Sequence, residues 1–278
     1  MPSLSGSAIC DSKAITPSRP GLKSSDMLQF CTFQGGADDH QSKNSLRSDA
    51  EVKVRFDTSM SELDREAIRA MRRSYGEVGL ESLPDDPFAA FSGWLKEAAA
   101  NDFIVEANAM VLSTLDGNEH ISTRTVLLKD ISEGGFTFFT NYSSRKAQAM
   151  EINSQVTLLF PWYAMERQVS ISGFAEKISE SESADYFATR PWSSQIGAWA
   201  SAQSSPLASR EELEQRFAGA SQKWPEGTTV PKPPHWGGYR VTPISIEFWQ
   251  GRYSRLHDRL RYERANTDAK WEITRYYP

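Results

Sequence analysis

Three side chains able to carry charge or move a proton stand at alternate positions near the end of this chain. They are Arg255, His257 and Arg259. On an extended strand, alternate side chains point to the same side of the sheet, so we expect these three to share one face. Adjacent positive groups repel one another unless something anionic or electron-rich lies over them. The row is therefore either a solvated strand face or one wall of an anion site.

Two further basic clusters stand at the ends of predicted elements. Arg124 and Lys129 bracket an apolar strand, and strand parity places them on opposite faces unless a bulge intervenes. Arg145 and Lys146 follow Ser143-Ser144 at the start of a predicted helix, where free backbone N–H groups attract phosphate. Basic residues at a helix start oppose the helix dipole. Either a bound anion or simple solvation of the two charges would account for them.

A third group has the chemistry of a phosphate clamp. Tyr186 and Arg190 lie four residues apart on one face of a predicted helix, and Pro191 ends that helix so that Ser194 can fold back beside them. Hydroxyl and guanidinium donors form charge-assisted hydrogen bonds with phosphate. A surface arginine beside a half-buried tyrosine would give the same pattern.

The composition limits the class of protein. The 278 residues carry a net charge of −5 and are 39% hydrophobic, which suits one large domain or two small ones. An acidic chain is a poor nucleic-acid binder, and no apolar run approaches the roughly 20 residues that span a bilayer. The two cysteines, Cys10 and Cys31, both precede the motifs, and no histidine has a second ligand at metal-site spacing. We expect a cytoplasmic protein without bound metal that uses its basic clusters on a small anion.

The pattern along the chain predicts a mainly β protein with attached helices. Residues 1–50 are polar and aperiodic and are expected to form a disordered extension, with one domain over 51–278. The alternative is an organellar transit peptide, against which acidic residues such as Asp11 and Asp26 argue. Hydrophobic spacing and, for the fourth of them, a capping box at Ser179 to Glu182 predict helices over 58–75, 86–100, 143–153, 179–190, 194–201 and 210–217. Strands are predicted over 109–115, 121–129, 135–141, 155–162, 168–177, 244–250, 259–263 and 271–276. Strands joined by short turns indicate an antiparallel barrel.

Taken together, these segments resemble the pyridoxamine 5′-phosphate oxidase family over about residues 72–275. Order and spacing carry the resemblance more than any single motif. The motifs are Arg72-x-x-Tyr75, Arg124-x-x-x-Leu128-Lys129, Phe139-Thr140-Asn141 with Ser144-Arg145-Lys146, Arg167-Gln168-Val169, Arg190-Pro191, Ser194-Gln195-Ile196-Gly197-Ala198, Gln203-Ser204-Ser205, and Glu247-Phe248-Trp249-Gln250-Gly251 with Arg255-Leu256-His257-Asp258-Arg259. Trp192 and the ending Arg275-Tyr276-Tyr277-Pro278 depart from the family pattern.

The resemblance implies an FMN-binding split β-barrel and a homodimer with two active sites at the subunit interface. It implies oxidation of pyridoxamine 5′-phosphate and pyridoxine 5′-phosphate to pyridoxal 5′-phosphate in vitamin B6 cofactor biosynthesis and salvage. Dioxygen would be the acceptor, giving hydrogen peroxide, with ammonia released from the amine. Residues matching the family's FMN contacts are Arg124, Thr125, Val126, Leu127, Phe139, Thr140, Arg145, Lys146, Gln168, Gln203, Ser204, Trp249 and Arg259. Residues matching its substrate contacts are Lys129, Tyr186, Arg190, Ser194, Arg255 and His257, with Arg72 and Tyr75 in a mobile lid.

Within that assignment the residues divide by role. Those expected at the FMN phosphate are Arg124, Arg145 and Lys146, and those expected at the ring system are Gln168, Trp249 and Arg259. Arg255 is expected to orient the substrate, because a guanidinium with a pKa above about 12 cannot serve as a base. His257, with an unperturbed pKa near 6.5, is the nearby side chain able to move a proton at neutral pH.

Two other functions stay open on sequence grounds. One is a carrier that binds FMN or pyridoxal phosphate without turnover, and the other is a different flavin enzyme on the same barrel, such as a flavin reductase. A carrier could lose Lys129, Tyr186, Arg190 or His257, all of which are present here. A reductase would not need both phosphate sets. The complete substrate set therefore favours the oxidase.

Overall fold

The computed structural model describes residues 65–71, 74–132 and 134–278, so the expected extension over residues 1–50 lies outside the described part. The helices are α1 (Arg65–Ala70), α2 (Pro87–Ala99), α3 (Arg145–Ile152), α4 (Glu180–Thr189), α5 (Trp192–Ala200) and α6 (Arg210–Lys223), with 3-10 turns η1 (Tyr163–Met165) and η2 (Tyr253–Arg255). The strands are β1 (Ala109–Leu115), β2 (Ile121–Leu127), β3 (Asp130–Ser132), β4 (Gly135–Asn141), β5 (Gln155–Trp162), β6 (Arg167–Lys177), β7 (Trp236–Gln250), β8 (Asp258–Glu263) and β9 (Glu272–Tyr276).

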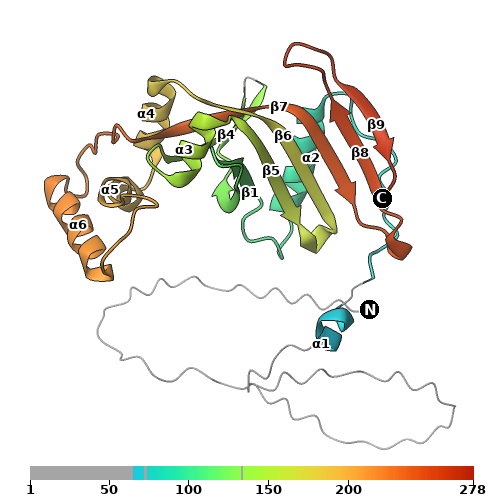
Figure 1. Ribbon diagram of the computed structural model, residues 1–278, viewed down its shortest axis with the longest axis horizontal. Coiled ribbons are helices and arrows are strands. Elements are labelled where there is room, and N and C mark those ends of the chain that lie inside the picture. The colour runs from blue at the N-terminus through green and yellow to red at the C-terminus, as the bar shows by residue number, and fades with distance from the viewer. Residues whose placement is uncertain (1–64, 72–73, 133) are drawn as a thin grey trace, which may run out of the picture. The chain divides into compact units, whose positions relative to one another are not determined.

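One antiparallel sheet contains all the described strands. Its order is β2-β1-β5-β6-β7-β4-β3, and β8 pairs with both β7 and β9. The long strand β7 joins its two parts, because residues 236–241 pair with β4 while residues 245–250 pair with β8. Figure 1 shows β7 running from beside α4 to the turn that precedes β8. The expected mainly β class with attached helices is confirmed.

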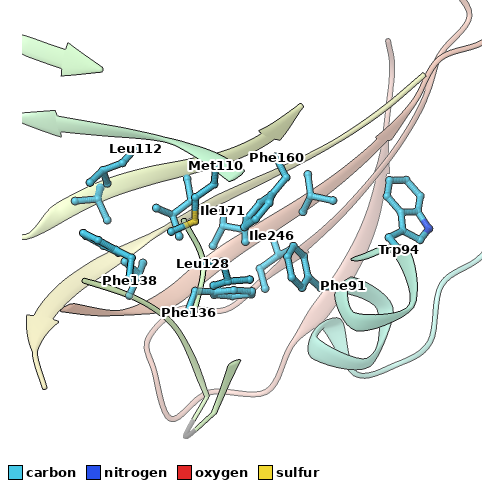
Figure 2. Close-up of a cluster of buried hydrophobic side chains, with 14 of the residues drawn as sticks. Phe91, Trp94, Met110, Leu112, Leu128, Phe136, Phe138, Phe160, Ile171 and Ile246 are labelled. Carbon is cyan, nitrogen blue, oxygen red and sulfur yellow. The ribbon is translucent and has the colours of Figure 1, made fainter. Parts of the chain in front are cut away.

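The core fills one face of the sheet. Strands β1 and β5 alternate buried and partly exposed residues, as period-two side-chain geometry requires. Helix α2 covers this face with Phe91, edge-on to Phe136 at 5.0 Å, and with Trp94, edge-on to Phe248 at 5.0 Å (Figure 2). Burying each of these rings contributes roughly 1.5–3 kcal/mol. Asp86 caps the start of α2 by accepting hydrogen bonds from two backbone N–H groups.

The second face of the sheet is polar and partly exposed. Its residues come from the alternate positions of β1, β5, β6 and β7, and they include Ser113, Thr157, Ser170 and Glu247. None of these is fully buried, although each stands in a central strand. A broad sheet face of this kind is available for contact with another surface.

Several element bounds differ from the sequence expectation. Strand β7 begins at Trp236, eight residues before the predicted start, because Gly237-Gly238 hides the strand pattern. Gly238 is required there, since a Cβ would stand 2.9 Å from the Phe139 ring. Helix α1 ends at Ala70, so the expected helix reaching Tyr75 is wrong at that end, and Arg72 lies outside the described residues. Strand β3 was not predicted, and α6 continues past Phe217 to Lys223.

Among the described residues, none of the helices combines the length and the apolar character that a membrane span requires.

Candidate functional site

A cavity of about 850 Å³ collects most of the predicted site residues. Its lining includes Arg124, Thr125, Val126, Leu127, Lys129, Phe139, Thr140, Arg145, Lys146, Tyr186, Arg190, Ser194, Gln203 and Ser204. These come from β2, β4, α3, α4 and α5, from the loop after α5, and from the short links that hold Lys129 and Arg190. The volume falls in the range of sites that hold a cofactor-sized ligand.

Arg124 and Lys129 line the same cavity, which corrects the expectation that they point to opposite faces. Strand parity does not extend to Lys129 because β2 ends at Leu127. Beyond that point the Leu128 N–H donates to the Asn108 carbonyl, and the Lys129 N–H donates to the Thr137 carbonyl. The chain thus turns from β1 toward β4 and brings Lys129 back to the side of Arg124.

Three cations gather at the start of α3. Lys146 is only 8% exposed, and its Nζ lies 3.2 Å from both Thr140 Oγ1 and Gln203 Oε1. Arg124 donates from Nη1 to Thr114 Oγ1 at 2.9 Å and also to a backbone carbonyl. The one carboxylate paired with this cluster in the described part of the chain is Asp116, 4.0 Å from Arg145. The cluster therefore carries excess positive charge that a bound anion would neutralise.

Burial makes the charge on Lys146 costly. Desolvation, with a smaller contribution from Arg124, lowers the pKa of Lys146 from 10.5 to about 8. Between these values the unfolded chain binds more protons than the folded protein, so the Lys146 contribution to stability rises with pH. Below about pH 8 the cost is present in full. A dianionic phosphate beside Nζ would remove it by favouring the charged form.

This gives a pH-dependent prediction for the FMN-free protein. Relative to Lys146→Met, the free energy of unfolding of the unsubstituted protein should increase between pH 8 and pH 10 by at most about 1.4 kcal/mol per pH unit. Urea unfolding of both proteins across that range measures the difference, and other titrating groups cancel in it. A difference that does not change with pH would contradict the assigned environment of Lys146.

At the other side of the cavity, aromatic rings surround a second cationic group. The rings of Phe139 and Tyr186 stack at 3.9 Å, and Trp236 lies parallel to both. The guanidinium carbon of Arg190 stands 4.7 Å from the centre of the Trp236 ring. Arg190 Nη1 is buried and has no hydrogen-bond partner among the described residues. Arg190 lines the cavity beside Ser194, and a guanidinium with an unused donor suits an incoming anion.

Five of the remaining predicted residues form a second group at the far end of β7, while Arg72 lies outside the described residues. Gln168 pairs with Trp249 across β6 and β7, and Trp249 pairs with Arg259 across β7 and β8, so these three lie side by side. The His257 ring packs on Trp249 with centroids 4.7 Å apart, and the Tyr75 ring stands edge-on to both. One group, the Trp249 cluster, therefore contains Tyr75, Gln168, Trp249, His257 and Arg259.

The prediction that Arg255, His257 and Arg259 alternate along one extended strand is wrong. Arg255 belongs to η2, and both Ser254 and Arg255 have positive φ angles. His257 precedes β8, which begins only at Asp258. Arg255, His257 and Arg259 therefore do not share one strand face, because a tight turn separates Arg255 from the strand.

The surroundings of His257 fix which nitrogen is free. The backbone N–H of Arg252 donates to His257 Nδ1 at 3.0 Å. The neutral ring therefore carries its proton on Nε2. Burial lowers the pKa of His257, and the nearby Arg255 lowers it further. Both effects favour the neutral imidazole, which presents Nε2–H.

Arg259 is held by an acidic neighbour. Its Nε and Nη2 donate to the two carboxylate oxygens of Glu247 at 3.0 and 2.8 Å. Arg261 also donates to Glu247, and the paired guanidinium groups keep the pKa of that carboxyl low despite the opposing effect of burial. Glu247 thus orients Arg259 on the partly exposed face of the sheet.

The two groups are separated along β7. Trp236, at the start of this strand, lines the cavity, whereas Trp249 lies thirteen positions later. At about 3.3 Å per residue, the path along the strand is about 40 Å. Because β7 runs across the sheet from beside α4 to the turn before β8 (Figure 1), the cavity and the Trp249 cluster of one chain lie at opposite ends of this strand.

Some cavity residues were not predicted as site residues. They are Ser122, Thr123, Asn141, Gly197, Ala198, Ser201 and Trp236. Asn141, Gly197 and Ala198 stood inside the quoted motifs, so their neighbours were a usable signal. Trp236 had a weaker one, a single aromatic residue directly before Gly237-Gly238.

Comparison with known proteins decides the family. Residues 97–224 match the family described as pyridoxamine 5′-phosphate oxidase, and residues 236–278 match the pyridoxine 5′-phosphate oxidase C-terminal dimerisation region. A pyridoxine/pyridoxamine 5′-phosphate oxidase from Streptomyces avermitilis is 48% identical over 77% of this chain and 99% of its own length. The chain belongs to the pyridoxamine 5′-phosphate oxidase family. The enzyme of the same name from Nostoc sp. is 50% identical, and the match covers 78% of this chain and the whole of the Nostoc enzyme.

Solved structures agree with this family membership. PhzG from Burkholderia lata, crystallised with tetrahydrophenazine-1-carboxylic acid, is 30% identical, covers 73% of this chain and 99% of its own, and superposes with a TM-score of 0.67. A pyridoxamine 5′-phosphate oxidase-related, FMN-binding protein from Nostoc punctiforme gives a TM-score of 0.57 at 15% identity, over 70% of this chain and all of its own. The latter likeness concerns the fold alone, the split barrel of the family.

Proposed function

We propose that this protein is an FMN-dependent oxidase that converts pyridoxamine 5′-phosphate and pyridoxine 5′-phosphate to pyridoxal 5′-phosphate. Dioxygen is the acceptor, hydrogen peroxide is formed, and the amine substrate releases ammonia. The observation that carries the proposal is that one cavity is lined by two sets of groups able to bind phosphate: Arg124, Arg145 and Lys146, and Lys129, Tyr186, Arg190 and Ser194. Neither a flavin reductase nor an FMN carrier needs both.

The chemistry of the donors fits FMN. Excess positive charge around Lys146 suits the FMN phosphate, and Thr140, Gln203 and Ser204 offer polar contacts beside it. The row of Gln168, Trp249 and Arg259 suits the ring system. When bound, FMN supplies the hydride acceptor that no amino-acid side chain provides, and dioxygen then reoxidises it.

The chain's own residues bind and orient the substrate. Arg190, with its orphaned Nη1, and Lys129 hold the substrate phosphate, assisted by the hydroxyls of Tyr186 and Ser194. Arg255 orients the pyridine ring and balances negative charge. His257 takes part in proton handling through Nε2, since Nδ1 is engaged by the Arg252 N–H. Tyr75 packs on His257 and Trp249, where it covers the proposed site of the substrate ring.

A single substitution tests the contribution of His257. His257→Asn removes Nε2–H, and we expect kcat to fall by about a hundredfold without vanishing, at the lower end of the range typical of proton transfer by a side chain. His120→Asn, which changes an exposed histidine on another part of the surface, is the matched control. Measuring kcat from acid to alkaline pH gives both the loss of rate and any change in the pH profile. An unchanged rate and pH profile in His257→Asn would remove His257 from the proton-handling role.

A homodimer with FMN at its interface completes the site. Two observations support this arrangement: the match of residues 236–278 to the family's dimerisation region, and the distance along β7 between the cavity and the Trp249 cluster. The partly exposed second face of the sheet supplies a surface for the contact. We assign residues 51–278 to the oxidase domain and residues 1–50 to an extension.

The oxidase is separated from its alternatives by one assay. The purified protein is expected to be yellow, to release FMN on denaturation, and to form peroxide and pyridoxal 5′-phosphate from pyridoxamine 5′-phosphate in air. Bound FMN without turnover would identify a carrier. Consumption of NADH with free flavin, and none of pyridoxamine 5′-phosphate, would identify a reductase.

A further inference from the structure

Trp236 occupies a position for which no role has been assigned. It is the first residue of β7, is only 7% exposed, and lines the cavity. Its ring contacts two of the four groups proposed to hold the substrate phosphate. It lies parallel to the Tyr186 ring with centroids 6.3 Å apart, and the Arg190 guanidinium stands over it at 4.7 Å.

Arg190 is held by aromatic rings and not by a carboxylate. In the described part of the chain it forms no ion pair, and the second ring near its guanidinium is Phe187 at 5.6 Å. Helix α4 ends at Thr189, and the backbone of Arg190 is extended. The Arg190 side chain therefore has no neighbour one turn further along this helix. An aromatic face attracts a cation without neutralising it, and tryptophan does so most strongly. A carboxylate in the same place would compete with phosphate for the guanidinium.

We propose that Trp236 is a positioning residue that holds Arg190 and Tyr186 in the geometry for binding a phosphate monoester while leaving the Arg190 charge available to the ligand. The assignment rests on the proposed function, because it names the support of the proposed substrate-phosphate site. Phe139, which belongs to β4, packs parallel to both Tyr186 and Trp236 and so helps to hold the three rings together. The ligand class that this arrangement selects is a phosphorylated ring compound over its unphosphorylated form.

The test compares binding of pyridoxal 5′-phosphate with binding of pyridoxal, using the FMN-saturated protein. Trp236→Leu should weaken binding of the phosphorylated compound by about tenfold, within the range expected for loss of a desolvated cation–π contact. Binding of pyridoxal should change little. Trp236→Phe keeps an aromatic face and should recover most of the loss. KM for pyridoxamine 5′-phosphate should rise with kcat nearly unchanged, because the lost contact is remote from the reacting carbon.

Trp199→Leu is the matched control. Trp199 belongs to the same small aromatic cluster and packs on Trp224 at 4.7 Å, but it does not contact Arg190. Equal loss of both ligands in Trp236→Leu, or an equal change in Trp199→Leu, would show a general structural effect and overturn the proposal. An unchanged ratio of the two affinities after FMN saturation would do the same. If the unsubstituted protein itself bound pyridoxal 5′-phosphate no better than pyridoxal, the proposed function would fail first.

Discussion

A heterodimer built from two inactive variants should recover about half of the activity of the unsubstituted dimer. Arg190→Glu damages the cavity, and Arg255→Glu reverses the charge of the proposed ring-orienting residue, which lies near His257 at the far end of β7. If each site takes its cavity from one copy and its Arg255 and Trp249 cluster from the other, one site of the mixed dimer collects both defects and the second has none. Co-expression with two different affinity tags isolates the mixed dimer, and peroxide formation measures its activity.

The matched control places both substitutions in one chain. Paired with an unsubstituted copy, this double variant damages the cavity of one site and reverses the Arg255 charge in the other, so the dimer should be almost inactive. Sites contained within single chains would give the opposite results: an inactive dimer with the substitutions on separate chains and half activity with both on one. Both dimers contain the same two substitutions and differ only in which chain carries them. The comparison therefore tests whether each site is shared between the chains.

Arg124→Glu should lower FMN affinity by about a thousandfold, on the order of 4 kcal/mol, because it removes one charge-assisted contact and places a like charge beside the phosphate. The cationic cluster makes the effect large, since Arg145 and Lys146 remain but are now partly neutralised by the new carboxylate. Fluorescence titration of the FMN-free protein measures the affinity. The glutamate should be tolerated in the fold, because it gains Lys146 and Arg145 as neighbours.

Arg210→Glu serves as the control for net charge. It makes the same change on α6, where Arg210 pairs with Glu214 on an exposed surface. Its FMN affinity should stay within about twofold of the original, because exposed charges distant from a site are screened by salt. Similar losses in the two variants would mean that overall charge, and not the cluster at the start of α3, governs FMN binding.

The sequence determined the elements wherever local signals were strong. β1, β4 and β5 match their predicted bounds, since alternation and turn residues act within a few positions. The capping box at Ser179 and Glu182 located α4 in the same way. Segments whose cues conflict were missed or shortened: Gly237 and Gly238 conceal the start of β7, although their lack of side chains is what lets Phe139 and Tyr142 pack there.

The candidate residues could also be read from the sequence, because short motifs in a fixed order identify the family. Their arrangement could not. Strand parity put Arg124 and Lys129 apart, and the end of β2 at Leu127 brought them into one cavity. Alternation put Arg255, His257 and Arg259 on one strand, but Arg255 belongs to the η2 turn and β8 begins only at Asp258.

What only the tertiary structure decided is which residues meet. Pairing in the sheet places Gln168, Trp249 and Arg259 side by side, while the length of β7 keeps them from the cavity of their own chain. The physical reason is that a motif constrains the backbone over a few residues, whereas a site depends on register and strand length set by the burial of the whole core. Trp236 illustrates this most clearly, since its contact with Arg190 joins positions 46 residues apart that no local pattern relates.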